Sequence, residues 1–355
     1  MMGAIRFILA ASVVMEHCRS YFGFMLYPGN MAVEMFFMIS GFYMGMVLSS
    51  RYRTVTWNDR FRFYCSRFWR LWPTFIITSV FVGIWWLIAF AVLGREPTSA
   101  GDFKTLVGSE LIRLMVLFSN VFMIGQDIPS LFHVSEASGV HFTLGPPEPL
   151  PDGSLWMGSM RAIGPAWSIG TEIWFYLLAP FLVRLPGSVL VLLIAGSLGL
   201  RAVLDHQGYV VYFFFPAQVA LFLVGVLAQR GSGWMASQAI GIAGVSTVLA
   251  ASLVFGSVGA LDQTYKWVLY LAFAVAMPAI FALGQNAKLD RSVGELSYPI
   301  YLTHMALLAV LIPVGKRMGV TIGGEALLAV TIAVSWFLYV WVDRPVSRWR
   351  QRFVR

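Results

Sequence analysis

The first apolar stretch of the chain carries charged and titratable side chains. Residues 5–26 contain Arg6, Glu16, His17 and Arg19 in an otherwise apolar sequence. Each such residue costs at least a few kcal/mol near the centre of a bilayer, so a helix that only anchored the protein would lack them. Arg6 and His17 are eleven residues apart, which on a helix returns them to within roughly 20° of one another at about 16 Å separation. The spacing predicts a cavity that runs from one membrane face to a titratable group near mid-membrane.

Further polar side chains recur in later apolar segments. They are Glu34 in the second segment, Trp167, Ser168 and Glu172 in the fourth, and Tyr298, Tyr301 and His304 in the ninth. Within the fourth and ninth segments, i, i+3 and i, i+4 spacing lets polar side chains share a helix face. A single histidine can simply bond a neighbouring helix, and Glu34 can pair with a cation or hydroxyl of the first or fourth segment. Two histidines together with two acidic residues favour a membrane-embedded site.

A cluster of arginines precedes the third apolar segment. In RFRFYCSRFWRLWP, Arg67 and Arg70 are three residues apart and share a helix face. One interpretation is anchoring at the cytoplasmic membrane surface, where Lys and Arg accumulate. The other is a phosphate site, because paired guanidiniums bind phosphate in forked geometry.

Composition excludes an ordinary soluble domain. Hydrophobic residues make up 58% of the 355 residues and charged residues 12%, which indicates an all-α polytopic membrane bundle forming a single domain over 1–355 without an appended soluble domain. The net charge of +8 reflects cytoplasmic helix ends rather than nucleic-acid binding, because no basic patch stands clear of the apolar segments. No cleavable signal is expected, and neither the two cysteines nor the histidines have the spacing of a metal site.

Hydropathy and arginine placement predict the topology. We expect about ten spans, near residues 5–26, 31–50, 71–93, 165–184, 187–204, 209–229, 236–256, 266–284, 293–314 and 322–342. Residues 106–124 are interrupted by Glu110, Arg113 and Asn120 and are expected to be re-entrant or interfacial. Most of the 25 Lys and Arg residues then face the cytoplasm, together with both termini, and the long loop 125–164 lies outside.

The order of motifs resembles the acyltransferase-3 family, bacterial multi-span enzymes that O-acylate surface and secreted glycans. Six stretches carry the resemblance: Arg6-x10-His17, AVEMFFMISGF (32–42), Arg67-Phe-Trp-Arg70-Leu-Trp-Pro73, Trp167-Ser168 with Glu172, Ser297-Tyr298-Pro299-Ile300-Tyr301-Leu302-Thr303-His304, and Asp343-Arg344-Pro345. The chain departs from the family at Glu16, where an apolar or aromatic residue is usual.

The resemblance implies an enzyme of the bacterial inner membrane. Its donor would be cytoplasmic acyl-CoA, with acetyl-CoA favoured, used as cosubstrate without a bound cofactor. Its acceptor would be a polysaccharide or lipid-linked glycan on the outer side. The candidate roles are catalysis for Arg6, His17, Glu172 and His304, donor binding for Arg6, Arg67 and Arg70, and acceptor binding for Glu34, Trp167, Ser168, Tyr298 and Tyr301.

The residue types support this chemistry independently. A sugar hydroxyl needs a base with a pKa near neutrality, which histidine supplies, and a thioester supplies the activated acyl group. A proton-coupled glycan transporter or flippase, with the buried His and Glu residues as a proton relay, is the competing hypothesis. A scaffold that has lost catalysis is a third, which the joint presence of Arg6, His17, Arg67 and Arg70 argues against.

Overall fold

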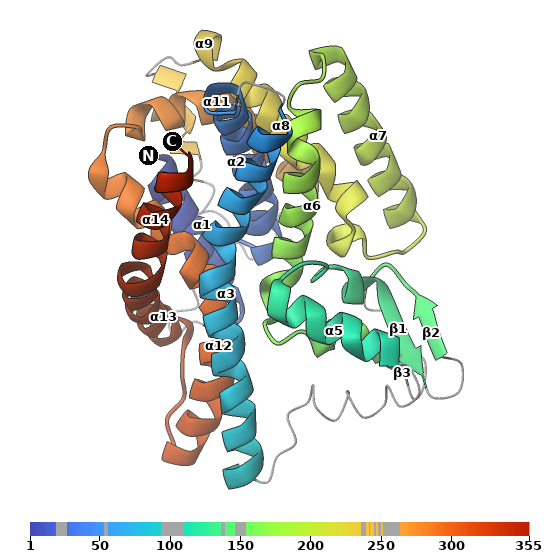
Figure 1. The fold of residues 1–355 in the computed structure, drawn as a ribbon, viewed down its shortest axis with the longest axis vertical. Helices are drawn as coiled ribbons and strands as arrows, with labels where there is room; N and C mark the ends of the chain where they lie inside the picture. The colour runs from blue at the N-terminus through green and yellow to red at the C-terminus, as the bar shows by residue number, and fades with distance from the viewer. Residues whose placement is uncertain are drawn as a thin grey trace.

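A computed structural model shows a bundle of helices with a small sheet on one side (Figure 1). It describes residues 1–18, 27–52, 56–93, 110–135, 139–145, 154–235, 239–240, 242–244, 246–247, 250 and 263–354. The main helices are α1 (Met2–Glu16), α2 (Gly29–Ser50), α3 (Trp57–Leu93), α5 (Glu110–Phe122), α6 (Trp167–Leu182), α7 (Gly187–His206), α8 (Phe215–Arg230), α9 (Ser232–Met235), α11 (Gln263–Gly284), α12 (Lys288–Met318), α13 (Gly324–Leu338) and α14 (Arg344–Val354).

Six stretches of described helix are long and apolar enough to cross a membrane. They are α2, α3, α7, α11, α12 and the continuous stretch Gly324–Gln351, in which a π-turn (Tyr339–Asp343) joins α13 to α14. These stretches establish a multi-pass helical membrane protein. The count of about ten spans stays a prediction, because the expected span 236–256 lies largely outside the described residues.

Several predicted boundaries were wrong. The first helix ends at Glu16 rather than near residue 26, and residues 19–26 lie outside the described residues. The third predicted span, 71–93, forms the later part of the longer helix α3, because the arginine-rich stretch before it is also helical. The sixth, predicted for 209–229, begins as a helix at Phe215. Hydropathy locates apolar runs, whereas the helix ends are decided by polar contacts that a window average does not see.

Glu16, the residue that departs from the family pattern, has a structural partner. Its Oε2 accepts a hydrogen bond of 2.6 Å from the backbone N–H of Gly29, at the start of α2. A carboxylate at a helix N-terminus satisfies a free N–H group and interacts favourably with the helix dipole. Glu16 therefore connects the end of α1 to the start of α2.

The helices of the bundle differ in length, and some extend further than others toward the end where the sheet lies. At 1.5 Å per residue, α1 is about 22 Å long and α12 about 46 Å. In Figure 1 the two termini lie close together at one end of the bundle, while α3 and α12 continue past the level of the sheet at the other. His304 is about halfway along α12. The ring of His17, just after α1, lies 5.1 Å from that of His304, so the end of α1 is level with the middle of α12.

A three-stranded antiparallel sheet was not predicted from the sequence. Strands β1 (Phe132–Ser135), β2 (Gly139–Phe142) and β3 (Ser154–Trp156) pair in the order β2-β1-β3. They lie in the long loop 125–164, where strands of three or four residues leave little alternation to detect. The all-α prediction therefore holds for the bundle but not for this loop.

Helix α5 has the apolar stripe of an interfacial segment. Leu114, Leu117, Phe118, Val121 and Phe122 are exposed at i, i+3, i+4, i+7 and i+8 spacing. The helix has 13 residues, too few to cross a bilayer alone. The prediction that 106–124 is re-entrant or interfacial stays a prediction, because its first residues lie outside the described ranges.

Glycines set the closest helix contacts in the core. α2 packs most extensively on α8, and a Cβ at Gly41 would lie 1.9 Å from the carbonyl oxygen of Phe222. Reciprocally, a Cβ at Gly225 would lie 1.9 Å from the carbonyl oxygen of Met38. Gly41 is therefore a packing residue, whereas its neighbour Ser40 faces a cavity described below.

Gly41→Ala should therefore destabilise the bundle. The added methyl group meets backbone rather than a flexible side chain, so α2 and α8 must separate, at a cost of about 1–3 kcal/mol. A lower midpoint of thermal unfolding in detergent is the expected result. Gly83→Ala is the matched control, because a Cβ at Gly83 has nothing within 4 Å. Equal midpoints for the two variants would contradict this packing.

Candidate active site

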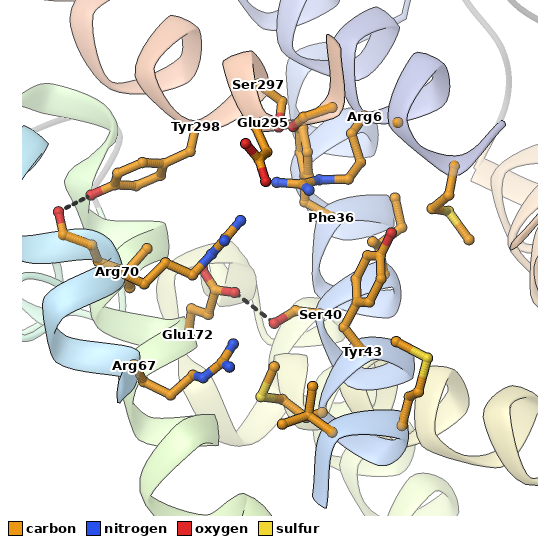
Figure 2. Close-up of a pocket in the computed structure, with 18 of the residues that line it drawn as sticks. Arg6, Phe36, Ser40, Tyr43, Arg67, Arg70, Glu172, Glu295, Ser297 and Tyr298 are labelled. Atoms are coloured by element: carbon orange, nitrogen blue, oxygen red, sulfur yellow. Dashed lines mark hydrogen bonds between the residues drawn. The ribbon is translucent and has the colours of Figure 1, made fainter. Parts of the chain in front are cut away.

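A cavity of about 660 Å³ lies among α1, α2, α3, α6 and α12, and the three arginines predicted to bind the donor are among the five that line it. Arg6 comes from α1, and Arg67 and Arg70 come from α3. Figure 2 shows the three side chains directed into the space around Glu172 of α6. The residues predicted to bind the donor therefore lie in one place, although they are separated by up to 64 positions in sequence. We call this space the arginine chamber.

Glu172 is held by hydroxyl groups. Its Oε1 accepts a hydrogen bond of 2.6 Å from Ser40 Oγ (Figure 2) and a second one from the hydroxyl of Tyr176. Arg6 and Tyr43 also line the chamber. Sequence reasoning missed the two hydroxyl partners of Glu172, although the i, i+4 spacing of Glu172 and Tyr176 was a usable signal.

The arginines keep hydrogen-bonding capacity for a ligand. The Nε atom of Arg67 is buried and has no hydrogen-bond partner among the described residues. The phenol of Tyr298, which also lines the chamber, donates to the carbonyl oxygen of Leu71 at 2.7 Å rather than to a charged group. A buried donor without a partner is costly. An anion bound in the chamber would satisfy it.

The chamber is long and opens toward the end of the bundle that holds the termini. Its lining on α2 extends from Val33 to Arg51 just beyond the helix, a distance of about 27 Å at helical rise. Polar residues line the part near the termini, including Arg51, Gln285, Arg291 and Gln351. The opposite end is lined by Phe36, Phe37, Ser168, Ile169 and Tyr301. The shape suits an extended ligand with one polar and one apolar end.

His17 and His304 form a pair just beyond the apolar end of the chamber. Their ring centroids are 5.1 Å apart with an interplanar angle of 61°. Neither histidine lines the chamber. The ring of His304 is 6.0 Å from that of Tyr301, which does line it. Arg6 lies in the chamber and His17 lies outside it, so the single cavity expected to connect them is divided into two compartments.

Backbone carbonyl groups fix the tautomer of each neutral histidine. Nδ1 of His17 lies 2.8 Å from the carbonyl oxygen of Val13, and Nδ1 of His304 lies 2.6 Å from that of Tyr301. A carbonyl oxygen only accepts, so Nδ1 donates in both rings and Nε2 carries the lone pair. His304 Nε2 is buried without a hydrogen-bond partner among the described residues, whereas the His17 side chain is exposed. His17 thus has an acceptor nitrogen on an exposed residue, whereas the acceptor nitrogen of His304 is enclosed.

The structure distributes the predicted acceptor residues over three places. Ser168, Tyr298 and Tyr301 line the arginine chamber. Trp167 packs against Tyr212 and Phe213 with ring centroids 4.4 and 4.9 Å away. Glu34 lies outside the chamber altogether.

Glu34 belongs to a buried ion cluster. Its two oxygens lie 2.6 Å from Arg201 of α7 and 2.7 Å from Lys266 of α11, and the hydroxyl of Tyr270 donates to it at 2.5 Å. The expected partner from the first or fourth span was wrong. Because both carboxylate oxygens are occupied by cations or a hydroxyl, the contacts favour the structural interpretation of Glu34.

The closing Asp-Arg-Pro motif also has a structural contact. Thr74 Oγ1 of α3 donates to Asp343 Oδ1 at 2.5 Å, and Asp343 lies at the end of the π-turn between α13 and α14. The motif therefore connects the C-terminal helices to α3, which carries Arg67 and Arg70.

Comparison with known proteins identifies the family. The model of the acyltransferase-3 family, described as an acyltransferase domain, matches residues 2–340. The chain belongs to this family and is a membrane acyltransferase. No curated protein and no solved structure matches it.

Proposed function

We propose that the protein transfers an acyl group, with acetyl favoured, from cytoplasmic acyl-CoA to a hydroxyl of an extracytoplasmic or lipid-linked glycan. The observation that carries the proposal is the position of the His17–His304 pair, which lies just beyond the apolar end of the arginine chamber. A thioester donor and a hydroxyl acceptor can thereby approach from opposite sides. The family match supports acyl transfer, and the donor and acceptor are inferred from the chemistry of these two compartments.

The arginine chamber suits the donor. CoA carries phosphates at one end and an acyl-pantetheine arm at the other, matching three guanidiniums and an apolar end lined by Phe36, Phe37 and Ile169. Charge-assisted hydrogen bonds from arginine to phosphate are stronger than neutral ones. Arg67, whose Nε has no partner, is the clearest candidate for such a contact.

His17 suits the acceptor chemistry. In the proposed reaction, His17 Nε2 takes the proton of a sugar hydroxyl, whose oxygen attacks the thioester carbonyl carbon. The C–S bond then breaks, the CoA thiolate leaves and is protonated, and an ester has formed. Tyr298 and the Glu172–Ser40 pair would position the thioester within the chamber, and His304 would orient His17 through the ring contact.

The proposed topology places both termini in the cytoplasm of a bacterium, within its inner membrane, and the sheet outside. Ser159, which follows β3, and Asn58, at the start of α3, are both exposed. A membrane-impermeant thiol reagent added to intact cells is expected to label Ser159→Cys but not Asn58→Cys. The unmodified protein, with Cys18 and Cys65, sets the background. Labelling of Asn58→Cys and not of Ser159→Cys would show that the topology is the reverse of the proposed one.

Mass spectrometry of surface glycans tests the proposed function. A deletion strain is expected to lack one O-acyl substituent, which complementation restores, and the mass added to the sugar identifies the acyl group. If the deletion instead leaves an unmodified glycan trapped inside the cell with no change in acylation, transport rather than acyl transfer is the function.

A further inference from the structure

A hydrogen-bonded pair, Tyr301 of α12 and Ser168 of α6, forms the wall between the chamber and the histidines. Tyr301 Oη and Ser168 Oγ are 2.7 Å apart, and Tyr301 Oη also donates to the carbonyl oxygen of Pro165 at 3.1 Å. Ser168 Oγ lies 3.0 Å from the same carbonyl oxygen. The two hydroxyl groups and Pro165 thus connect α12 to the start of α6.

The Tyr301–Ser168 pair is closely packed on the side that faces the chamber. Both Tyr301 and Ser168 are buried, with 8% and 6% of their surface exposed, and the ring of Phe36 lies 6.3 Å from that of Tyr301. On the other side, His304 follows Tyr301 by one turn of α12, and its Nδ1 hydrogen-bonds the Tyr301 carbonyl oxygen. Displacing Tyr301 would therefore alter both the end of the chamber and the orientation of His304.

The wall separates a base from the donor. His17 is exposed, and its Nε2 is the base of the proposed reaction. Water and a sugar hydroxyl are chemically similar nucleophiles, and a thioester beside His17 would react with either. An enzyme that waits for a glycan must keep the thioester from His17 until the acceptor has replaced water.

We propose that the Tyr301–Ser168 pair is a partition that determines whether the acyl group goes to the glycan or to water. In the closed form seen here, the thioester stays in the arginine chamber. Acceptor binding beside His17 opens the pair and admits the thioester carbonyl. The inference rests on the proposed function and adds a specificity role to two residues that sequence reasoning assigned to acceptor binding.

The reaction that the partition suppresses is hydrolysis. Water would lose a proton to His17 Nε2 and attack the thioester carbonyl carbon, the C–S bond would break, and CoA would leave as a thiol together with a carboxylate. No further reactant is required. Hydrolysis in the absence of acceptor therefore measures how well the pair is closed.

Tyr301→Phe keeps the ring and removes the hydroxyl. We expect it to raise the release of [¹⁴C]acetate from [¹⁴C]acetyl-CoA, by purified full-length protein without acceptor, about three- to tenfold, the range for loss of one buried hydrogen bond. Ser168→Ala removes the same contact from the other side and should have a similar effect. Because both substitutions break the shared bond between Tyr301 and Ser168, the double variant should raise hydrolysis by less than the product of the two single effects.

Thr303→Val is the matched control. Its hydroxyl is also buried in α12, but it bonds the carbonyl oxygen of Pro299 and lies 3.4 Å from Ser335 Oγ, away from the chamber. The control should leave the ratio of hydrolysis to transfer unchanged, with transfer measured on the lipid-linked glycan fraction extracted from the deletion strain.

Two results would overturn the partition. One is an unchanged ratio of hydrolysis to transfer in both Tyr301→Phe and Ser168→Ala. The other is loss of transfer without any rise in hydrolysis, which would return the two residues to acceptor binding alone. Failure of the proposed function is distinguishable, because the unmodified protein would then acylate no glycan from acetyl-CoA.

Discussion

His17→Ala is expected to abolish acyl transfer to the glycan while the protein still accumulates in the membrane. His17 is the exposed member of the histidine pair, its Nε2 carries the lone pair, and it follows the last residue of α1, so truncation removes the base without disturbing a helix interior. General-base catalysis contributes about 10²–10⁴-fold. The measurement is glycan O-acylation in a complemented deletion strain, normalised to the amount of membrane protein.

Two further variants distinguish the role of His17 from that of His304. His17→Gln should stay inactive, because an amide can hydrogen-bond but cannot take the proton. His304→Ala should be less severe if His304 orients His17 through the ring contact. Near-normal acylation by a well-expressed His17→Ala variant would contradict the assignment and leave His304 or Glu172 as the candidate base.

Arg67→Ala and Arg70→Ala should weaken donor binding strongly and folding only slightly. Loss of a charge-assisted hydrogen bond to phosphate costs on the order of 1.5–3 kcal/mol, equivalent to about a 10- to 150-fold rise in the dissociation constant. Binding of a non-hydrolysable acetyl-CoA analogue to the purified protein measures the effect directly. The loss should be larger than for removal of a surface arginine, because both side chains line the chamber.

Arg62→Ala is the control for anchoring. Arg62 is on the same helix but is exposed and does not line the chamber. It should lower affinity little, and the effect should disappear at higher salt as expected for an exposed charge. If Arg62→Ala matches Arg67→Ala, or if neither chamber variant changes affinity, the arginines serve the cytoplasmic surface of the membrane instead.

The sequence located much of the candidate site because helical spacing and residue type carry local information. Arg67 and Arg70 share a face at i, i+3, and the structure places both in the chamber with Arg6 and Glu172. The proximity of His17 to His304 could not be derived from spacing, since they are 287 positions apart and only the packing of α1 on α12 brings them together.

Other features could not be predicted from the residue pattern within single segments. Glu34 was recognised as a costly intramembrane charge, but its partners on α7 and α11 depend on tertiary packing. The small sheet was missed because its strands are short. Glu16 was recognised as unusual, and its role became clear only from its contact with Gly29. The separation of the chamber from the histidine pair depends on Tyr301 and Ser168, which come from different helices.

Transfer of an acyl group across a membrane tests the central claim most directly. Inverted membrane vesicles expose the cytoplasmic face, so [¹⁴C]acetyl-CoA added outside reaches only the proposed donor side, while the glycan acceptor is enclosed. The account predicts label bound covalently to the enclosed glycan, and none with His17→Ala. Label that appears on the glycan only after the vesicles are permeabilised, or glycan movement without covalent label, would contradict it.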